Sequence, residues 1–304
     1  MDYEAVLKAI EGRVPRYFGR GRMAQHIPAL RRVPAKRFGM AVKLVDGTEF
    51  SVGHADQPIS IQSISKVFTL AMALKCVGPR LWRRVGREPS GNPFNSLVQL
   101  EYERGIPRNP FINAGALVVT DCVVTHDVLA RSAVLDEVRM LSGNRKVRFD
   151  FEVVRSERTH GHLNFAIAHY LKANNNLVSD VDRVLDVYFH QCSIAMSCMD
   201  LARAFVHLAN GGRSVSTGEQ LLSPRRVKRI NALMMTCGLY DAVGNFAYRV
   251  GIPAKSGIGG AIVGVIPGVL SVCVWSPELD DNGNSFVGSK ALEIFTTRIK
   301  KSVF

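Results

Sequence analysis

The sequence predicts an α+β protein in which strands from both chain ends form one antiparallel sheet, with a mainly helical lobe inserted between them. Residues 38–53 contain two extended apolar runs joined by Asp46-Gly47, a dipeptide that favours a tight hairpin turn. Residues 254–275 repeat this pattern around Pro267-Gly268. Between the two hairpins the apolar spacing is mainly helical. Strands at the ends and helices in the middle therefore define the fold class.

Three segments support the helical prediction. Residues 63–77 are apolar on nearly every side, as expected of a buried helix. Ser197 and Asp200 have the spacing of a capping box at the start of a second helix. A C-terminal helix that could pack on the sheet is indicated by an apolar stripe at Leu292, Phe295 and Ile299.

We expect one catalytic unit over residues 1–304, because no repeat or long linker separates independent domains. The sheet lobe should take in about residues 1–62 and 245–304, and the helical lobe about residues 63–244.

Composition and charge narrow the function classes. The 304 residues are 47% hydrophobic and 21% charged, which is sufficient for a large buried core. The net charge of +13 is spread over short runs at 31–37, 79–87 and 225–229, without interleaved aromatic residues. We therefore predict a solvated basic surface and no nucleic-acid partner. A basic nucleic-acid-binding protein without catalytic activity is the alternative from another class.

The chain also carries signals of location. Acidic residues begin the sequence, and no apolar segment of signal-peptide length follows. Glycine and proline interrupt the longest apolar stretches, so we expect no transmembrane segment and no membrane partner. The six cysteines have no C-x-x-C pair or zinc-site spacing, which favours buried free thiols. These observations predict a cytoplasmic protein.

Ser63 and Lys66 form an S-x-x-K element at the beginning of the predicted buried helix. Residues three apart on a helix share a face, so Lys66 could reach the Ser63 hydroxyl. A lysine among apolar neighbours has a lowered pKa and can activate a serine as nucleophile. The alternative is a serine at a helix start beside a surface lysine. The otherwise apolar surroundings of Lys66 favour the catalytic interpretation.

A second element, Lys255-Ser256-Gly257, begins the C-terminal hairpin, and Gly259 and Gly260 follow. Glycines in a strand often mark a close approach of ligand to backbone, where N–H groups could bind an oxyanion. The alternative is a bulged strand end with an exposed lysine. S-x-x-K followed by K-[ST]-G is the order found in the penicillin-recognising serine enzymes, although their middle S-D-N element is absent here.

Longer strings carry a family resemblance. They are PISIQSISKVFTL at 58–70, FNSLVQLEYERGIPRNPFINAGALV at 94–118, MMTCGLYDAVG at 234–244, PAKSGIGGAIV at 253–263 and WSPELDDNGNS at 275–285. Together they resemble the bacterial serine-dependent glutaminases over almost the whole chain. The resemblance implies a fold like that of β-lactamases and penicillin-binding proteins. It also implies hydrolysis of L-glutamine to L-glutamate and ammonia.

By the same resemblance, Ser63 is the nucleophile and Lys66 its base. The substrate-binding residues that it implies, besides Ser63, are Asn113, Glu157, Asn164, Tyr188, Tyr240 and Ile258. Glu157 would pair with the α-ammonium group, and amide side chains would bind the carboxylate and carbonyl oxygens. As a mechanistic hypothesis, Tyr240 is also a catalytic residue that relays protons to the leaving group and to the attacking water, with Lys255 nearby in support. Each has an ordinary alternative as a loop asparagine, a surface glutamate or a core tyrosine.

Three positions depart from the family pattern. Where the family commonly has a tyrosine in a Y-I-P motif, this sequence has His26, which would add an ionisation near neutral pH if it faces the site. Leu163 replaces the usual arginine before Asn164, and Ile258 replaces a more usual valine.

We expect no metal and no cofactor. His160, His162 and His169 have no acidic or cysteine partner at a suitable spacing, and a serine mechanism needs no metal. The expected partner is the small molecule L-glutamine, and the resemblance implies a homo-oligomer, either a dimer or a homotetramer. A β-lactam- or peptide-acylating serine enzyme of the same fold is the alternative enzyme class.

Overall fold

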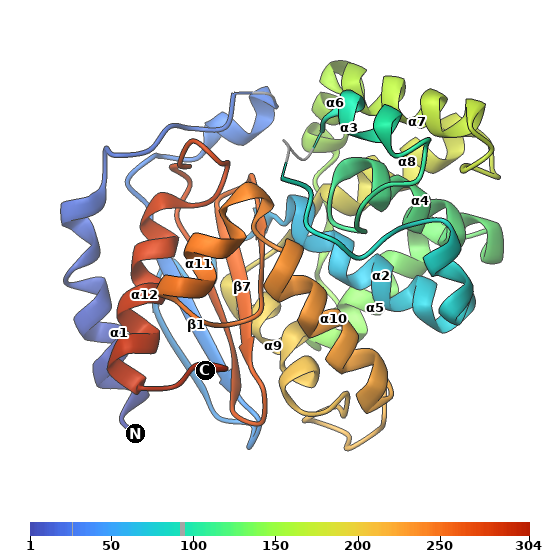
Figure 1. Cartoon of the computed structure of the whole chain (residues 1–304). Helices are drawn as coiled ribbons and strands as arrows, with labels where there is room; N and C mark the ends of the chain where they lie inside the picture. Colours follow the sequence, from blue (N-terminus) through green and yellow to red (C-terminus); the bar gives the residue numbers. More distant parts are fainter. Residues whose placement is uncertain (26, 92–94) are drawn as a thin grey trace.

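The main sheet joins the two ends of the chain. The computed structural model describes residues 1–25, 27–91 and 95–304. Its five-stranded antiparallel sheet has the order β2-β1-β8-β7-β6 (Figure 1). The strands are β1 (Gly39–Leu44), β2 (Glu49–Gly53), β6 (Ala254–Gly257), β7 (Ala261–Ile266) and β8 (Leu270–Trp275). Because β1 pairs with β8, the sheet contains both ends of the chain, as the sequence predicts.

The predicted turns lie where expected. Asp46-Gly47 separates β1 from β2, and Gly47 has a φ of 96°, a value that favours glycine. Pro267-Gly268 separates β7 from β8. The C-terminal pattern contains one more strand than the two predicted runs, because residues 258–260 turn the chain between β6 and β7.

Helices form most of the remaining structure. The α-helices of the described residues are α1 (Tyr3–Glu11), α2 (Ser65–Cys76), α3 (Leu97–Tyr102), α4 (Asn113–His126), α5 (Ala130–Ser142), α6 (Phe151–His160), α7 (His162–Ala173), α8 (Val181–Cys192), α9 (Cys198–Ala209), α10 (Pro224–Cys237), α11 (Val243–Arg249) and α12 (Phe286–Ile299). The 3₁₀ turns are η1 (Val14–Tyr17), η2 (Pro28–Arg32), η3 (Gln62–Ile64), η4 (Gly78–Arg83) and η5 (Tyr240–Ala242). The predicted capping box of Ser197 and Asp200 is present at the start of α9.

Each face of the main sheet supports a separate hydrophobic core. Side chains alternate between faces along a strand, so Val263 and Val265 of β7 join the core with α9, while Ile262 and Ile266 join the core with α1 and α12. Burying each such side chain contributes about 1.5–3 kcal/mol. Figure 1 shows α1 and α12 on one side of the sheet and the helical region on the other. The expected lobe boundaries near residues 62 and 245 stay a prediction.

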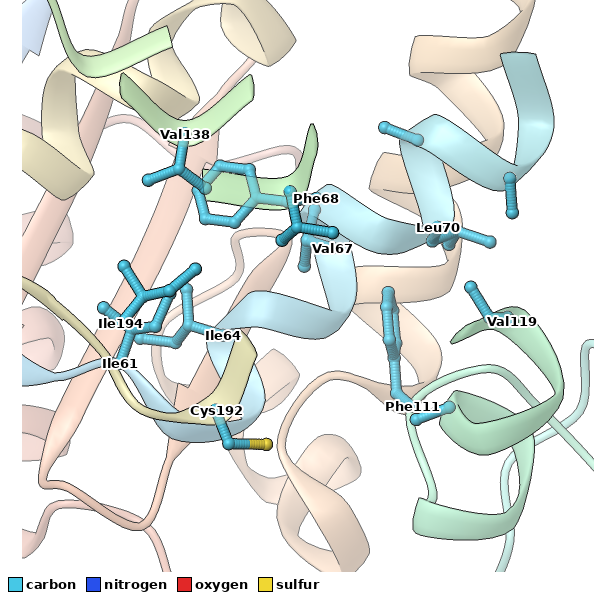
Figure 2. Close-up of a cluster of buried hydrophobic side chains, with 14 of the residues drawn as sticks. Ile61, Ile64, Val67, Phe68, Leu70, Phe111, Val119, Val138, Cys192 and Ile194 are labelled. Atoms are coloured by element: carbon cyan, nitrogen blue, oxygen red, sulfur yellow. The ribbon is translucent and has the colours of Figure 1, made fainter. Parts of the chain in front are cut away.

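α2 runs through the helical region and is buried on nearly all sides. Val67, Phe68 and Leu70 are almost fully inaccessible to solvent. Figure 2 shows Leu70 near Phe111 and Val119, the latter on α4, and Phe68 near Val138 on α5. Apolar neighbours on several sides fix the position of this helix, and therefore that of the segment that leads into it.

One local prediction is wrong in detail. The sequence predicts one helix over residues 63–77, but Ser63 lies in the 3₁₀ turn η3, and α2 begins at Ser65. Gln62, at the start of this turn, has a φ of 49°, a left-handed value that an α-helix cannot include. The strand that precedes this turn, β3 (Ile59–Ser60), is the edge strand of a second, three-stranded sheet. The order of this sheet is β3, β5 (Ile194–Met196) and β4 (Arg148–Phe149).

The cysteines are free thiols, as predicted, but not all of them are buried. Cys76, at the end of α2, is exposed, whereas the other five are inaccessible. Over residues 1–25, 27–91 and 95–304, every helix is too short or too polar to cross a bilayer.

Candidate active site

Ser63 is presented by a short, well-anchored segment between β3 and α2. The Ser60 hydroxyl donates to the Cys192 carbonyl at 2.8 Å, and the Gln62 side-chain amide donates to the Ser60 hydroxyl at 3.0 Å. Only 8% of Ser63 is exposed. The segment is thus held by buried hydrogen bonds, and a small part of Ser63 remains open to the cavity described below.

Lys66 is almost completely buried one turn further along. Its Nζ donates to Asn113 Oδ1 at 2.7 Å and to the Phe111 carbonyl at 3.2 Å, so among the described residues its hydrogen-bond acceptors do not include Ser63. Burial lowers the pKa of Lys66 to about 8. A lysine with this pKa is partly neutral near neutral pH, which a general base requires.

Asn113 connects Lys66 to Asn164 through hydrogen bonds of its side-chain amide. It is the first residue of α4, and its Nδ2 donates to Asn164 Oδ1 on α7 at 2.9 Å. The preceding loop is fixed by Asn109, whose Oδ1 accepts from the backbone N–H groups of Phe111 and Ile112. The result is a hydrogen-bonded row of Lys66, Asn113 and Asn164.

Glu157 supplies a carboxylate to the same region. It lies on α6 and is 5% exposed. Burial raises its pKa to about 7, while a hydrogen bond with Gln62 and the charge of Lys66 act in the opposite direction. A cation bound beside this carboxyl group would lower its pKa again and keep it ionised.

Tyr240 contacts Lys255 with its ring and interacts with Ser63 through its phenol. Burial raises the pKa of Tyr240 to about 12, and the interactions of its phenol with Ser63 and Ser256 act to lower it. Lys255 Nζ is 4.6 Å from the centre of the Tyr240 ring and donates to the carbonyls of Gly238 and Ser256, at 2.9 and 2.6 Å. Burial, and then the charge of Lys66, lowers the pKa of Lys255 well below its usual value.

Tyr188, on α8, completes the interior of the site. The centre of its ring is 6.0 Å from Lys66 Nζ, and burial raises the pKa of its phenol well above the usual value. This tyrosine therefore remains neutral at ordinary pH.

Ile258 lies in the turn between β6 and β7, which touches the serine segment. A Cβ atom on Gly257 would come within 2.5 Å of the Ile61 carbonyl oxygen, and one on Gly259 within 2.4 Å of the Ser60 carbonyl oxygen. Any other residue at these two glycine positions would force the turn away from Ser63. The two glycines thus allow close contact between this turn and the serine segment, and the predicted approach of a ligand to the same backbone stays a prediction.

One cavity of about 250 Å³ brings most of these residues together, a volume close to the small-molecule range. Its lining includes the predicted residues Ser63, Asn113, Glu157, Asn164, Tyr188 and Ile258. Lys66 and Tyr240 adjoin it through their contacts with Asn113 and Ser63.

The cavity is also lined by residues that the motifs do not indicate as parts of the site. They include Gln62, Asn95 and Cys192. Gln62 lies inside the IQSISK string, and its interaction with Glu157 could have been suspected only if the distant α6 had been placed beside it. His26 lies outside the described residues, whereas its neighbour Ile27 lines the cavity. Leu163 and His160 also line the cavity, and the His160 ring contacts the Ser156 carbonyl.

Comparisons with known proteins give the family. The model of the glutaminase family matches residues 21–304. Curated glutaminases of Aeromonas salmonicida and Paraburkholderia phytofirmans are 54% identical over 300 residues and 50% identical over 304 residues. The alignments cover 98% of both chains in the first case and 100% of both in the second.

Solved structures agree with the sequence relatives. A probable glutaminase designated ybaS is 36% identical, with a TM-score of 0.93, over 100% of this chain and 99% of that chain. A Bacillus subtilis glutaminase in covalent complex with 5-oxo-L-norleucine is 31% identical, with a TM-score of 0.89, over 99% of both chains.

The α+β architecture is the β-lactamase-like fold, and the protein is an enzyme of the amidohydrolase class. Within that class, the chain belongs to the glutaminase family. The predictions of family and fold are thereby confirmed.

Proposed function

We propose that the protein hydrolyses L-glutamine to L-glutamate and ammonia through a Ser63 acyl-enzyme, with Lys66 as the general base. The observation that carries the proposal is the grouping of Ser63, Asn113 and Glu157 on one small cavity, with the buried Lys66 amine bonded to Asn113. This arrangement supplies a nucleophile, a base and groups complementary to an amino acid.

Recognition of glutamine depends on charge and hydrogen bonding. The α-ammonium group pairs with Glu157. Burial raises the pKa of this carboxyl to about 7, and a cation beside it stabilises the ionised form. Asn113 and Asn164 present amide groups that bind the α-carboxylate. Tyr188 closes the interior wall of the cavity with its ring.

In the acylation step, neutral Lys66 takes the proton of the Ser63 hydroxyl while Oγ forms a bond to the side-chain amide carbon. The negative charge on the amide oxygen is held by the backbone N–H groups of Ser63 and Ile258. The carbon–nitrogen bond then breaks, and the nitrogen takes the transferred proton and leaves as ammonia. A glutamyl ester of Ser63 remains.

In the second step, a water molecule attacks the ester carbon after giving up a proton to the base. The bond to Ser63 Oγ breaks, and the serine recovers a proton as glutamate leaves. The phenol of Tyr240 interacts with Ser63 and has a pKa of about 12, so it stays protonated and can pass a proton between the base and the leaving group. Lys255 holds the Tyr240 ring in position.

A solved relative supports covalent chemistry. The Bacillus subtilis glutaminase formed its covalent complex by reaction with 6-diazo-5-oxo-L-norleucine, an analogue of glutamine. The same reagent should label Ser63 here. By resemblance we also propose a cytoplasmic location and a homo-oligomer, either a dimer or a homotetramer.

The test is ammonia release from glutamine, asparagine and, as an amide-free control, glutamate, with nitrocefin hydrolysis measured in parallel. Wild type should act on glutamine, and Ser63→Ala should lose activity by at least roughly 1,000-fold while keeping its unfolding temperature. Ser289→Ala, a hydroxyl on α12 outside the cavity, is the matched control. Activity of Ser63→Ala within tenfold of wild type, or faster turnover of nitrocefin than of glutamine, would refute the proposal.

A further inference from the structure

The turn at residues 257–260 has its backbone orientation fixed by hydrogen bonds. The Gly260 N–H donates to the Gly257 carbonyl at 3.0 Å, closing a tight turn. The peptide bonds of the described residues are trans, so the N–H of Ile258 points away from the Gly257 carbonyl and out of the turn. Among the described residues this N–H has no hydrogen-bond acceptor. It is therefore a free donor beside the cavity that Ile258 and Ser63 share.

Residues at the end of β8 hold this turn by two hydrogen bonds. The indole Nε1 of Trp275 donates to the Gly259 carbonyl at 3.0 Å, and the Ser276 N–H donates to the Gly260 carbonyl at 3.0 Å. Ser276 is fixed in turn, because its carbonyl accepts from the Ser285 hydroxyl at 2.6 Å. The indole is buried, so water does not compete for its bond.

The turn is therefore restrained by contacts with two segments. Gly257 and Gly259 lie against the carbonyls of Ile61 and Ser60, too close for a Cβ atom. Trp275 and Ser276 supply the hydrogen bonds described above. Of these restraints, the indole N–H is the one made by a side chain directly to the turn, so a substitution can remove it without changing the backbone.

We infer that Trp275 is a positioning residue for the oxyanion hole: its indole N–H, bonded to the Gly259 carbonyl, holds the Ile258 N–H where it stabilises the transition state. The inference rests on the proposed Ser63 mechanism. The Ile258 donor acts on charge that develops only during reaction, so its displacement should slow chemistry without weakening ground-state binding.

The experiment compares two changes at Trp275 with a change at Trp82, the other tryptophan of the chain, which is half-buried on η4. Trp275→Phe removes the N–H and part of the ring. A second variant carries 3-benzothienylalanine at 275, which keeps the bicyclic shape and lacks only the N–H. The readouts are kcat and KM for glutamine, and the Kd of glutamate by titration calorimetry.

Both Trp275 variants should lower kcat by roughly 10- to 100-fold and leave KM and the glutamate Kd within about twofold of wild type. Trp82→Phe should change none of these quantities. If the benzothienyl variant keeps kcat within about twofold, or if kcat and glutamate affinity fall together, the positioning role is refuted. Since Trp275→Phe also leaves a cavity, the benzothienyl variant decides the case if the phenylalanine variant does not fold.

Ser63→Ala measured alongside separates the two ideas. A dead Ser63→Ala protein with fully active Trp275 variants would overturn only the positioning role. An active Ser63→Ala protein would overturn the proposed mechanism and, with it, the need for an oxyanion hole at Ile258.

Discussion

Asn113 accepts a hydrogen bond from Lys66 Nζ at 2.7 Å and donates one to Asn164 at 2.9 Å, so one amide connects the proposed base to the proposed substrate pocket. An acceptor at this distance favours the charged form of the lysine. The side chain at position 113 should therefore tune the pH at which Lys66 becomes a base.

Changing Asn113 should move the pH profile in two directions. As a neutral base, Lys66 makes activity rise with pH through its pKa, which burial lowers to about 8. Asn113→Asp places an anion beside it, stabilises the charged form and should move this rise upward by about one pH unit or more. Asn113→Ala removes an acceptor for the charged form and should move the rise downward.

The measurement is kcat/KM against pH, which reports groups of the free enzyme. Both variants should have lower maxima, because each loses the amide donor to Asn164. Shifts in the same direction for the two variants would show that another group sets the profile.

The buried Glu157 carboxyl should reduce the stability of the fold at neutral pH. Its folded pKa is raised to about 7 from an ordinary value of 4.5, so the folded state holds the proton more tightly than the unfolded state. The resulting stabilisation is complete below the unfolded pKa and is lost as pH rises through 4.5 to 7. Glu157→Gln, which mimics the protonated carboxyl, should thus be more stable than wild type near pH 8, by about 1–3 kcal/mol.

Urea unfolding near pH 8 and near pH 5 measures this difference. The advantage of Glu157→Gln should shrink at the lower pH, where the wild-type carboxyl takes up its proton. Glu152→Gln, a change at an exposed carboxyl on the same helix, is the control and should show no comparable gain. A pH-independent difference between wild type and Glu157→Gln would contradict burial as the cause of the shifted pKa.

The sheet was predictable because its signals are local. Asp46-Gly47 and Pro267-Gly268 mark turns by their own backbone preferences, and the capping box at Ser197 depends on a partner three residues away. The start of α2 was harder to predict from the sequence. Its 3₁₀ turn begins at Gln62, which has a positive φ and a side chain that interacts with the distant Glu157.

The site shows the same division. The motifs indicated Ser63, Lys66 and Ile258, but they did not indicate that Lys66 would bond Asn113 and Phe111 instead of the serine. That arrangement depends on how α4 packs against α2, a long-range contact with no sequence period. Tertiary contacts of this kind cannot be read from spacing along one chain.

Glu157 should distinguish ligands by their ammonium group. If its carboxylate binds the α-ammonium, Glu157→Gln should raise KM for glutamine by roughly 100-fold, since the loss of a buried charge pair costs about 3 kcal/mol. Labelling of Ser63 by a diazo-ketone analogue without the amine should slow far less. Mass spectrometry of the labelled protein follows the second rate, and equal losses for both ligands would assign Glu157 a general structural role.

The final prediction concerns the two buried tyrosines, Tyr240 and Tyr188, which differ in their contacts with the nucleophile. The phenol of Tyr240 interacts with Ser63 and Ser256, whereas Tyr188 lies beside Lys66 with its ring centre 6.0 Å from Nζ.

Tyr240→Phe keeps the ring that faces Lys255 and removes the proton relay, so kcat should fall by roughly 100-fold or more with KM little changed. Tyr188→Phe removes a hydroxyl that contacts Cys192 and should act mainly on KM. Steady-state kinetics of both variants with glutamine makes the comparison: if Tyr188→Phe lowers kcat as much as Tyr240→Phe does, Tyr240 has no special part in proton transfer.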